Sequence, residues 1–189
     1  KFQVLNMLNT KYFIFPVNQQ GQTAPILNPY AYGNAWFVDK VQYVDNANEE
    51  IDAVGKVDLK NTAIVDVKFK DILKGVTEGL KFSASTVKLV SYKPNHLIYE
   101  TSSPKDGVVV FSEIYYQPGW QVTIDDQPAD IARANYILRA MNVPAGTHTI
   151  EMRFDPQSLH VTEGIAYGAL ILLLIGVIAV IWIYYKKKK

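Results

Sequence analysis

The chain has 189 residues, of which 49% are hydrophobic and 20% charged, and this composition is ordinary for a globular protein. Without its four C-terminal lysines it carries 15 basic and 18 acidic residues, so it has no basic field that would attract nucleic acid. The absence of cysteine excludes disulfide bonds, thiolate metal ligands and a thiol nucleophile.

Residues 1–85 predict a mixed α/β part. Its expected elements are, in chain order, a strand at 11–16, a loop at 17–33, a strand at 36–44, a helix at 46–54, a strand at 61–67 and one or two helical turns at 69–76. Because acidic residues favour the first turn of a helix, Glu49 and Glu50 are interpreted as helix N-terminal charges rather than as a catalytic pair.

Residues 86–157 predict an antiparallel β-sandwich that packs with the first part. Short strands are expected near 86–93, 96–103, 107–116, 120–125, 130–142 (either continuous or broken) and 147–154, separated by turn-forming residues. The predicted fold class is therefore mainly β: a jelly-roll-like antiparallel sandwich with a mixed α/β N-terminal part and one C-terminal transmembrane helix.

The stretch YYQPGW at 115–120 places three large aromatic residues around a Pro-Gly turn. Trp120 alternates in register with Val122 and Ile124, which favours a position in the sandwich core. Tyr115 and Tyr116 point to opposite faces of their strand. Aromatic rings at a strand end also stack on sugar rings, so the stretch is either a structural corner or, for at least one ring, a sugar contact.

Residues 165–185 contain no charged side chain, and this run of 21 residues is long enough to cross a bilayer as a helix. We expect a short linker at 158–163, a transmembrane helix at 164–185 and a cytoplasmic lysine tail at 186–189, since lysines just past a span mark its cytoplasmic end. Residues 1–163 would then be extracytoplasmic. The start of the chain lacks any export signal, which predicts that it is the end of a longer membrane protein. The absence of cysteine and of Asn-x-Ser/Thr sequons fits a bacterial envelope protein, so the expected location is the bacterial cell (inner) membrane.

Motifs of common catalytic and cofactor sites are missing from the sequence, including HExxH, GxSxG, the Walker loop and GxGxxG. Asp125, Asp126 and Asp130 lack the spacing of a calcium loop and are interpreted as a solvated hairpin turn. No catalytic residue, cofactor or metal site is therefore predicted here. Gly164 and Gly168 have the spacing of a helix-packing motif, which would suit contact with further transmembrane helices of a parent protein.

Four segments are specific in sequence: LNMLNTKYFI (5–14), NPYAYGNAWFV (28–38), KPNHLIYETSSPKDGVVVFSEIYYQPGW (93–120) and ARANYILRAMNVPAGTHTIEMRFDP (132–156). Together with the following span, they resemble the C-terminal portion of the YfhO family of large bacterial multi-pass membrane proteins. One departure is Asp126, where the resemblance leads us to expect a glycine in the hairpin. Aspartate tolerates turn geometry, so the hairpin is expected to survive.

The resemblance implies a membrane glycosyltransferase of the GT-C type, which uses a polyprenyl-phosphate-linked sugar on the outer face of the membrane. The catalytic acidic residue of such enzymes usually lies in an early extracytoplasmic loop that this chain does not contain. The chain would then be an accessory part that handles the acceptor. The alternative is a non-catalytic, membrane-tethered interaction or assembly module of the cell envelope.

The candidate surface for a sugar or a partner consists of polar and aromatic residues: Asn34, Trp36, Tyr115, Tyr116, Trp120, Arg133 and Arg139. The arginines have a structural alternative, because a buried arginine needs a partner, and Glu113 could pair with Arg139. Expected partners are the lipid bilayer, the remaining transmembrane helices of the parent and a glycan or lipid-linked sugar, but not nucleic acid.

Overall fold

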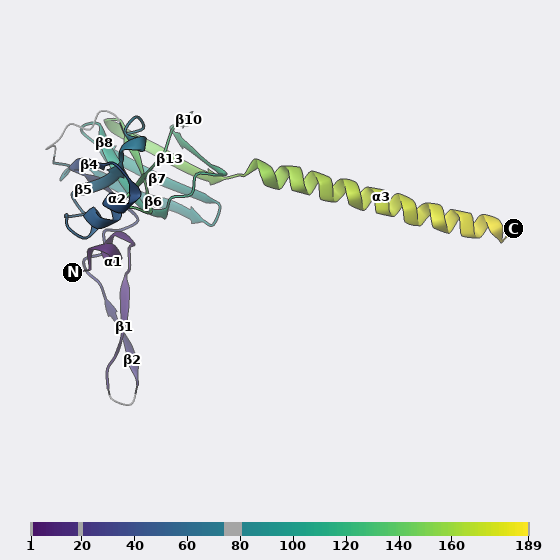
Figure 1. The fold of residues 1–189 in the computed structure, drawn as a ribbon, viewed down its shortest axis with the longest axis horizontal. Coiled ribbons are helices and arrows are strands. Elements are labelled where there is room, and N and C mark those ends of the chain that lie inside the picture. Colours follow the sequence, from purple (N-terminus) through teal and green to yellow (C-terminus); the bar gives the residue numbers. More distant parts are fainter. Residues whose placement is uncertain (1, 19–20, 74–80, 189) are drawn as a thin grey trace.

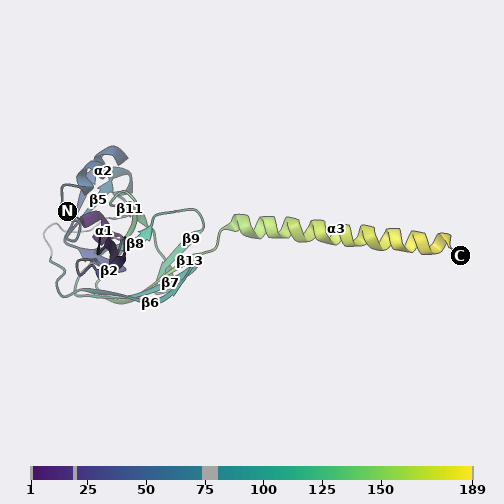
Figure 2. The same cartoon turned by 90° about the horizontal axis from the view of Figure 1, so that it is seen from below.

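The computed structural model describes residues 2–18, 21–73 and 81–188, which form a β-rich domain followed by one long helix (Figures 1 and 2). The helix leaves one end of the domain, and a thin β-hairpin projects from another side (Figure 1). The predicted fold class, mainly antiparallel β-strands with a small N-terminal α/β part and an apolar C-terminal helix, is confirmed.

Two antiparallel sheets form a sandwich. Their strands are β3 (Ala35–Val38), β6 (Thr86–Lys93), β7 (His96–Ser103), β8 (Gly107–Ile114), β9 (Trp120–Ile124), β10 (Gln127–Pro128), β11 (Ala132–Ala134), β12 (Leu138–Val143) and β13 (Gly146–Phe154). The five-stranded sheet has the order β10-β9-β13-β7-β6, and the four-stranded sheet has the order β11-β12-β8-β3. Because β3 pairs with β8, the first 85 residues contribute a strand to the sandwich.

Strand β8 is apolar on both faces because both of its faces are covered. Val109 and Phe111 belong to the core between the two sheets, while Val108 and Val110 belong to a second core on the outer side of the four-stranded sheet. All four side chains are completely buried. β8 is a central strand of its sheet, since it lies between β12 and β3.

A third layer covers the outer face of the four-stranded sheet. It consists of β4 (Lys40–Val44), α2 (Ala47–Val54) and β5 (Thr62–Asp66), and β4 and β5 pair in parallel. Parallel neighbours need a crossover connection, which α2 provides. Asn46 caps this helix by accepting hydrogen bonds from the backbone nitrogens of Asn48 and Glu49, each at 3.1 Å. The predicted helix at 46–54 and strand at 61–67 are confirmed.

The single strand predicted at 36–44 is wrong, because the structure divides it at Asp39 into β3 and β4, which belong to different sheets. The backbone nitrogens of Asp39 and Lys40 both donate to the carbonyl oxygen of Asn61, at 2.8 and 3.2 Å. The Asp39 carboxylate accepts a third bond from the backbone nitrogen of Phe82, at 3.0 Å. These contacts are remote in sequence, so no local pattern reveals the break.

The strand predicted at 11–16 is confirmed, but the loop predicted at 17–33 contains a second strand that pairs with it in a hairpin. The short helix α1 (Gln3–Met7) leads into β1 (Tyr12–Pro16), which pairs antiparallel with β2 (Thr23–Leu27). Glycine, proline and glutamine around β2 indicated a loop, but proline is tolerated in an edge strand, and a two-stranded sheet has only edges.

The remaining strands of the sandwich agree with the prediction to within a few residues. The strand expected at 130–142 is broken, as anticipated, where Asn135 and Tyr136 adopt positive φ angles of 50° and 73°. The hairpin at Asp125 and Asp126 also exists, with φ angles of 49° and 65°, so aspartate does replace the expected glycine there. The helical turns expected at 69–76 are present at residues 69–73, where Ile72 and Leu73 donate to the Phe69 carbonyl directly after a 3-10 helix at Val67–Phe69. Residues 74–76 lie outside the described residues.

Helix α3 (Gln157–Lys187) is 31 residues long and contains the predicted span. It begins before the predicted start at residue 164, so the linker expected at 158–163 is helical. None of its residues is buried against the domain, and among the described residues it is the one helix long and apolar enough to cross a membrane. The chain therefore consists of a β-rich domain and one candidate membrane helix.

Candidate functional site

The Pro-Gly turn of YYQPGW packs on the start of α3. Gly119 has a φ angle of 85°, and its carbonyl oxygen accepts a hydrogen bond of 2.7 Å from the backbone nitrogen of Asp155. A Cβ atom at this position would lie 2.7 Å from the Cβ atom of Pro156. The turn therefore requires glycine for its backbone angle and for its close approach to the chain that enters the helix.

Trp120 is half-buried between two other side chains. The guanidinium carbon of Arg139 lies 4.0 Å from the centre of its ring, and the Phe154 ring lies at 5.4 Å with a tilted geometry. Trp120 packs against the core between the sheets, as do Val122 and Ile124, so the predicted shared face is confirmed. A guanidinium this close to an indole ring makes a cation–π contact and covers much of that face.

Arg139 is only 3% exposed, and its contacts are made inside the sandwich. Its Nε donates to the carbonyl oxygen of Ile114 at 3.0 Å, and one terminal nitrogen lies 3.5 Å from the sulfur of Met152. The suggested ion pair with Glu113 is not among those that the described residues form within 4.0 Å. Burial lowers the pKa of Arg139, and the charge of Glu113 partly offsets this.

Two further titratable groups share this end of the sandwich. Burial raises the pKa of Glu113, and the positive charge of Arg139 opposes that rise. Tyr99 is completely buried, and burial raises its pKa far above the ordinary value. Its hydroxyl oxygen has no hydrogen-bond partner among the described residues. These groups form a partly charged interior beside Trp120 rather than an open catalytic pair.

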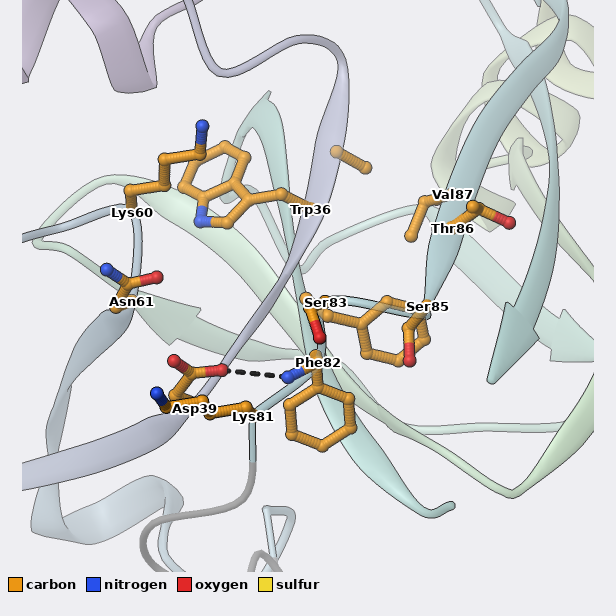
Figure 3. Close-up of a pocket in the computed structure, with 12 residues that line it drawn as sticks. Trp36, Asp39, Lys60, Asn61, Lys81, Phe82, Ser83, Ser85, Thr86 and Val87 are labelled. Atoms are coloured by element: carbon orange, nitrogen blue, oxygen red, sulfur yellow. Dashed lines mark hydrogen bonds between the residues drawn. The ribbon is translucent and has the colours of Figure 1, made fainter. Parts of the chain in front are cut away.

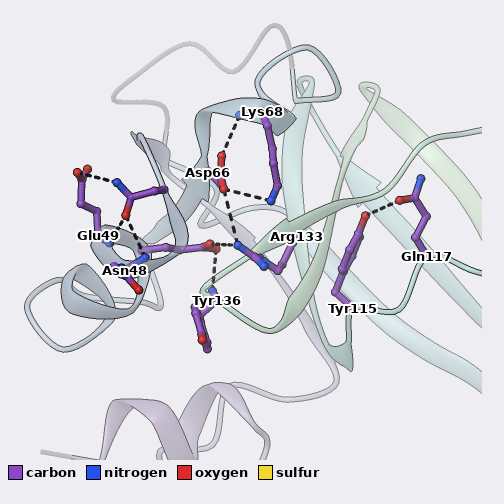
Figure 4. A network of polar contacts seen from close by, with 10 residues as sticks. Asn48, Glu49, Asp66, Lys68, Tyr115, Gln117, Arg133 and Tyr136 are labelled. Carbon is purple, nitrogen blue, oxygen red and sulfur yellow. Dashed lines mark hydrogen bonds and ion pairs between the residues drawn. The ribbon is translucent and has the colours of Figure 1, made fainter.

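Arg133 belongs to a buried ion-pair network between the third layer and the sandwich (Figure 4). One of its terminal nitrogens lies 2.6 Å from an oxygen of Glu50 and 3.8 Å from an oxygen of Asp66. The other Glu50 oxygen accepts from the backbone nitrogen of Tyr136 at 2.8 Å. Glu49 and Glu50 both lie in the first turn of α2, as interpreted, but Glu50 is 0% exposed and is paired with Arg133.

The adjacent Asn135 connects the same two layers. It is completely buried, and its side-chain oxygen accepts from the backbone nitrogen of Ile64 at 2.9 Å, while its own backbone nitrogen donates to the Ile64 carbonyl at 2.8 Å. Asn135, whose backbone is in the left-handed conformation, thus forms two strand-like hydrogen bonds with Ile64 of β5. The segment NYILRA (135–140) is explained largely by packing and hydrogen bonding.

The other predicted site residues do not form one surface. Tyr115 is half-buried against the Phe69 ring at 5.6 Å, whereas Tyr116 is 54% exposed. Asn34 accepts a hydrogen bond of 2.9 Å from the side chain of Asn9. Trp36 is 8% exposed and lies in the core beneath β3, away from the corner at Trp120. The structure therefore separates the predicted residues into several groups, most of them with internal contacts.

A cleft at the edge of the sandwich brings together residues that the sequence did not connect (Figure 3). It has a volume of about 450 Å³ and lies where the edge strands β3 and β6 approach each other. Its polar lining comes from three separate segments: Asp39, Lys60, Asn61, Lys81, Ser83, Ser85 and Thr86. Such groups can hydrogen-bond a ligand rich in hydroxyl groups, and the volume is within the usual range for small-molecule sites.

The aromatic residues of this cleft are mostly covered. Trp36, Phe37 and Phe82 are 7–9% exposed, and the two phenylalanine rings stack at 5.3 Å. The indole nitrogen of Trp36 is buried without a hydrogen-bond partner among the described residues, and Figure 3 shows it on the side of Lys60 and Asn61. The cleft thus offers hydrogen bonds rather than an open stacking surface.

Gly107 shows where the cleft lies along the sandwich. A Cβ atom at Gly107 would collide with the Phe82 ring, so the cleft is beside the first residue of β8. Gly119, which contacts Pro156 before α3, lies in the turn that connects the last residue of β8, Ile114, to β9. The cleft and α3 therefore lie at opposite ends of β8.

A half-buried histidine lies at the same end of the domain as the cleft. His148 Nδ1 is 2.6 Å from a carboxylate oxygen of Asp125, and its Nε2 is 3.1 Å from the carbonyl oxygen of Ala145. The hydrogen bond to Asp125 and that to Ala145 raise the pKa of His148, and the same bond to His148 lowers the pKa of Asp125. Among the described residues, no three potential metal ligands are close enough to hold an ion.

The comparison with protein families matches residues 2–166 to the model described as bacterial membrane protein YfhO. The chain belongs to the YfhO family. The match covers the whole β-rich domain and the start of α3, which agrees with the resemblance of the separate segments. Comparison with curated proteins and with solved structures gave no match. Because the YfhO family consists of bacterial membrane proteins and the chain has a candidate membrane helix, contact with the lipid bilayer is implied.

Proposed function

We propose that residues 1–163 form a non-catalytic, extracytoplasmic domain of a GT-C-type membrane glycosyltransferase. Membership in the YfhO family supports this proposal, as does the position of the domain directly before the candidate span. The buried carboxylate of Glu50 is paired with Arg133 and serves the fold, which agrees with an accessory rather than a catalytic role. The catalytic acid would be supplied by another part of the full protein.

The single observation that carries a ligand-handling role is the edge cleft (Figure 3). Lys60 and Lys81 can donate charge-assisted hydrogen bonds to hydroxyl or carboxylate oxygens, and Asp39 can accept from hydroxyl groups. The unpaired indole N–H of Trp36 is costly when buried, and an acceptor at the cleft wall would relieve that cost. We assign the acceptor saccharide to this cleft, with recognition by hydrogen bonds rather than by ring stacking.

Binding of labelled oligosaccharides to the 189-residue chain in nanodiscs tests this assignment. Replacing Lys81 by methionine is expected to weaken binding by about 10- to 100-fold, because a hydrogen bond to a charged group contributes about 1.5–3 kcal/mol. The matched control is Lys88→Met, which removes an exposed lysine of β6 that does not line the cleft. Equal losses in both variants, or no saccharide binding by the parent chain, would refute the assignment.

The orientation of the chain is a separate part of the proposal. Because the sequence has no cysteine, single-cysteine variants can be labelled in intact cells with a maleimide that does not cross membranes. Position 88 in β6 should react, and position 188 at the lysine end of α3 should react only after the membrane is permeabilised. Labelling of position 188 in intact cells would reverse the topology and remove the domain from the outer face.

A second candidate function is a membrane-tethered assembly module without a sugar role. It is favoured by the exposed apolar side chains of the β1–β2 hairpin, which are typical of an interaction surface. Activity of the complete glycosyltransferase separates the two functions. An assembly module predicts that Lys81→Met leaves sugar transfer unchanged, whereas an acceptor site predicts a higher KM for the acceptor.

A further inference from the structure

The β1–β2 hairpin exposes apolar side chains on both of its faces. Because side chains alternate along a strand and Tyr12 lies opposite Leu27, these two residues and Ile14 share one face, and Phe15 and Ile26 share the other. Their exposed fractions are 59% for Tyr12, 61% for Leu27, 72% for Ile14, 47% for Phe15 and 51% for Ile26. Apolar side chains exposed on both faces indicate that the hairpin contacts a membrane or another protein in its native environment.

Hydrogen bonds hold the base of the hairpin against the domain, so the structure itself determines that the hairpin projects. Asn28 is 6% exposed, and its side-chain nitrogen donates to Asn6 at 2.9 Å and to the carbonyl oxygen of Thr10 at 2.8 Å. At the other end, Gln22 donates from its backbone to the side chain of Asn18, and Val17 donates to the Gln22 carbonyl at 2.7 Å. The strands between these points form their own two-stranded sheet (Figure 1).

The charge of this region suits a lipid surface. The sequence from residue 2 to residue 38 contains no acidic residue, and Lys11 is its one charged side chain. Aromatic residues are frequent in it, and tyrosine in particular favours the boundary between headgroups and acyl chains. A segment without negative charge can approach an anionic leaflet without repulsion.

A bilayer also explains why both faces of the hairpin are apolar, because lipid surrounds an inserted hairpin on both sides. A flat surface of a partner protein would cover only one of the two faces. The free outer edges of β1 and β2 limit the depth, because unpaired backbone groups are costly in the hydrocarbon core. At the headgroup boundary, water and headgroups can satisfy those edges. The uncharged polar side chains of Asn18 and Gln22 suit the same depth.

The position of the domain makes this contact possible. Helix α3 brings the domain to a bilayer, and none of its residues is buried against the domain. The domain contacts the start of the helix at the Asp155–Pro156 connection, against which Gly119 packs. The hairpin runs across the direction of α3 and projects clear of the sandwich (Figure 1). Figure 1 shows the hairpin at the end of the domain away from α3, so the domain must tilt about the Asp155–Pro156 connection for the hairpin to reach the headgroups.

We propose that the β1–β2 hairpin is a second membrane contact, which inserts into the headgroup boundary of the leaflet from which α3 enters. The domain is then held to the bilayer at two separated points, and its cleft has a defined orientation above the membrane. This contact does not depend on whether the cleft binds a saccharide.

Fluorescence in proteoliposomes tests the proposal on the full chain. An environment-sensitive fluorophore is attached to Ile14→Cys and, separately, to Ile26→Cys, in vesicles of phosphatidylethanolamine and phosphatidylglycerol with or without spin-labelled lipid. The matched control is Ile51→Cys on α2, which is 49% exposed and apolar but remote from the hairpin. We expect a blue-shifted emission and quenching by spin-labelled lipid at positions 14 and 26, and neither effect at position 51.

Aqueous iodide distinguishes the other occupants. A fluorophore at position 14 that is protected from iodide but not quenched by lipid would show that a protein surface covers the hairpin, and the proposal would be wrong. Dilution of the chain in the bilayer would then identify a second copy by loss of that protection. Free quenching by iodide at position 14 would also overturn the proposal, because the hairpin would be in water. Unfolding curves that match those of the unlabelled parent show that each variant is folded.

Discussion

Replacing Gly119 by alanine tests the explanation of the YYQPGW corner. A residue with a Cβ atom in the left-handed backbone conformation costs about 1–2 kcal/mol. The new Cβ would lie 2.7 Å from the Cβ of Pro156 and 2.9 Å from the ring of Phe154, both closer than van der Waals contact. Forcing extra atoms into such a packed place costs about 1–3 kcal/mol. The variant should therefore lose about 2–5 kcal/mol of unfolding free energy.

Urea unfolding of the chain in detergent micelles measures this loss. Trp182 in α3 is replaced by phenylalanine in every variant, so that fluorescence reports the two tryptophans of the domain. Two glycines provide controls. Gly55 has a φ angle of −79°, and a Cβ atom there would meet no other atom within 4 Å, so alanine should be neutral or stabilising by up to about 1 kcal/mol. Gly107→Ala should cost about 1–3 kcal/mol, because it adds the collision with Phe82 without the backbone strain.

A Gly119→Ala variant that unfolds within about 0.5 kcal/mol of the parent, the range of an ordinary surface substitution, would refute this explanation of the corner. So would a Gly55→Ala variant that loses as much stability as Gly119→Ala, since the effect would then be a general one of alanine for glycine. A loss at Gly119 equal to that at Gly107 would show that contact, and not the positive φ angle, dominates.

Two further predictions concern charged groups. Glu50→Ala should lower the unfolding free energy by about 3 kcal/mol in the same urea titration. This is the low end of the cost of breaking a buried ion pair, because Arg133 is 20% exposed. Glu49→Ala, at the exposed start of the helix, should cost well under half of that. The pair of His148 and Asp125 should stabilise the fold fully between about pH 4 and pH 6.5. Because the pKa of His148 is raised in the folded state, its contribution is lost as the pH rises through that folded-state pKa. Because the pKa of Asp125 is lowered in the folded state, its contribution is lost as the pH falls through that folded-state pKa. Thermal unfolding from pH 4 to pH 8 should therefore differ between the parent and His148→Asn mainly within that window, and a constant difference across the range would contradict the assignment.

Local patterns were sufficient for the strands of the sandwich and for the span. Alternation in WQVTID correctly placed Trp120 with Val122 and Ile124, because one face of that strand is covered by the opposite sheet. The strand expected near 107–116 is present as β8, whose apolar residues are covered on both faces. These predictions succeeded because burial on a face repeats with the period of the strand.

The candidate site could not be predicted in the same way. Its polar lining comes from the end of β3, the turn before β5 and the segment before β6, and these meet only because β3 and β6 are neighbouring edges of two sheets. Conversely, Arg133 and Arg139 were candidates for a ligand surface, but the fold supplies them with Glu50 and with the Trp120 ring. A side chain's type shows that it needs a partner, and only the tertiary arrangement shows which one it has.

The sequence by itself determined the class of this protein: a cysteine-free, mainly β domain of the YfhO family joined to one helix long and apolar enough to cross a bilayer. Composition and periodicity are sufficient for this because they reflect which surfaces must leave water. The tertiary structure alone decided the break at Asp39, the projecting hairpin and the edge cleft. Each depends on hydrogen bonds or packing between residues far apart in the chain, for which the local sequence carries no repeating signal.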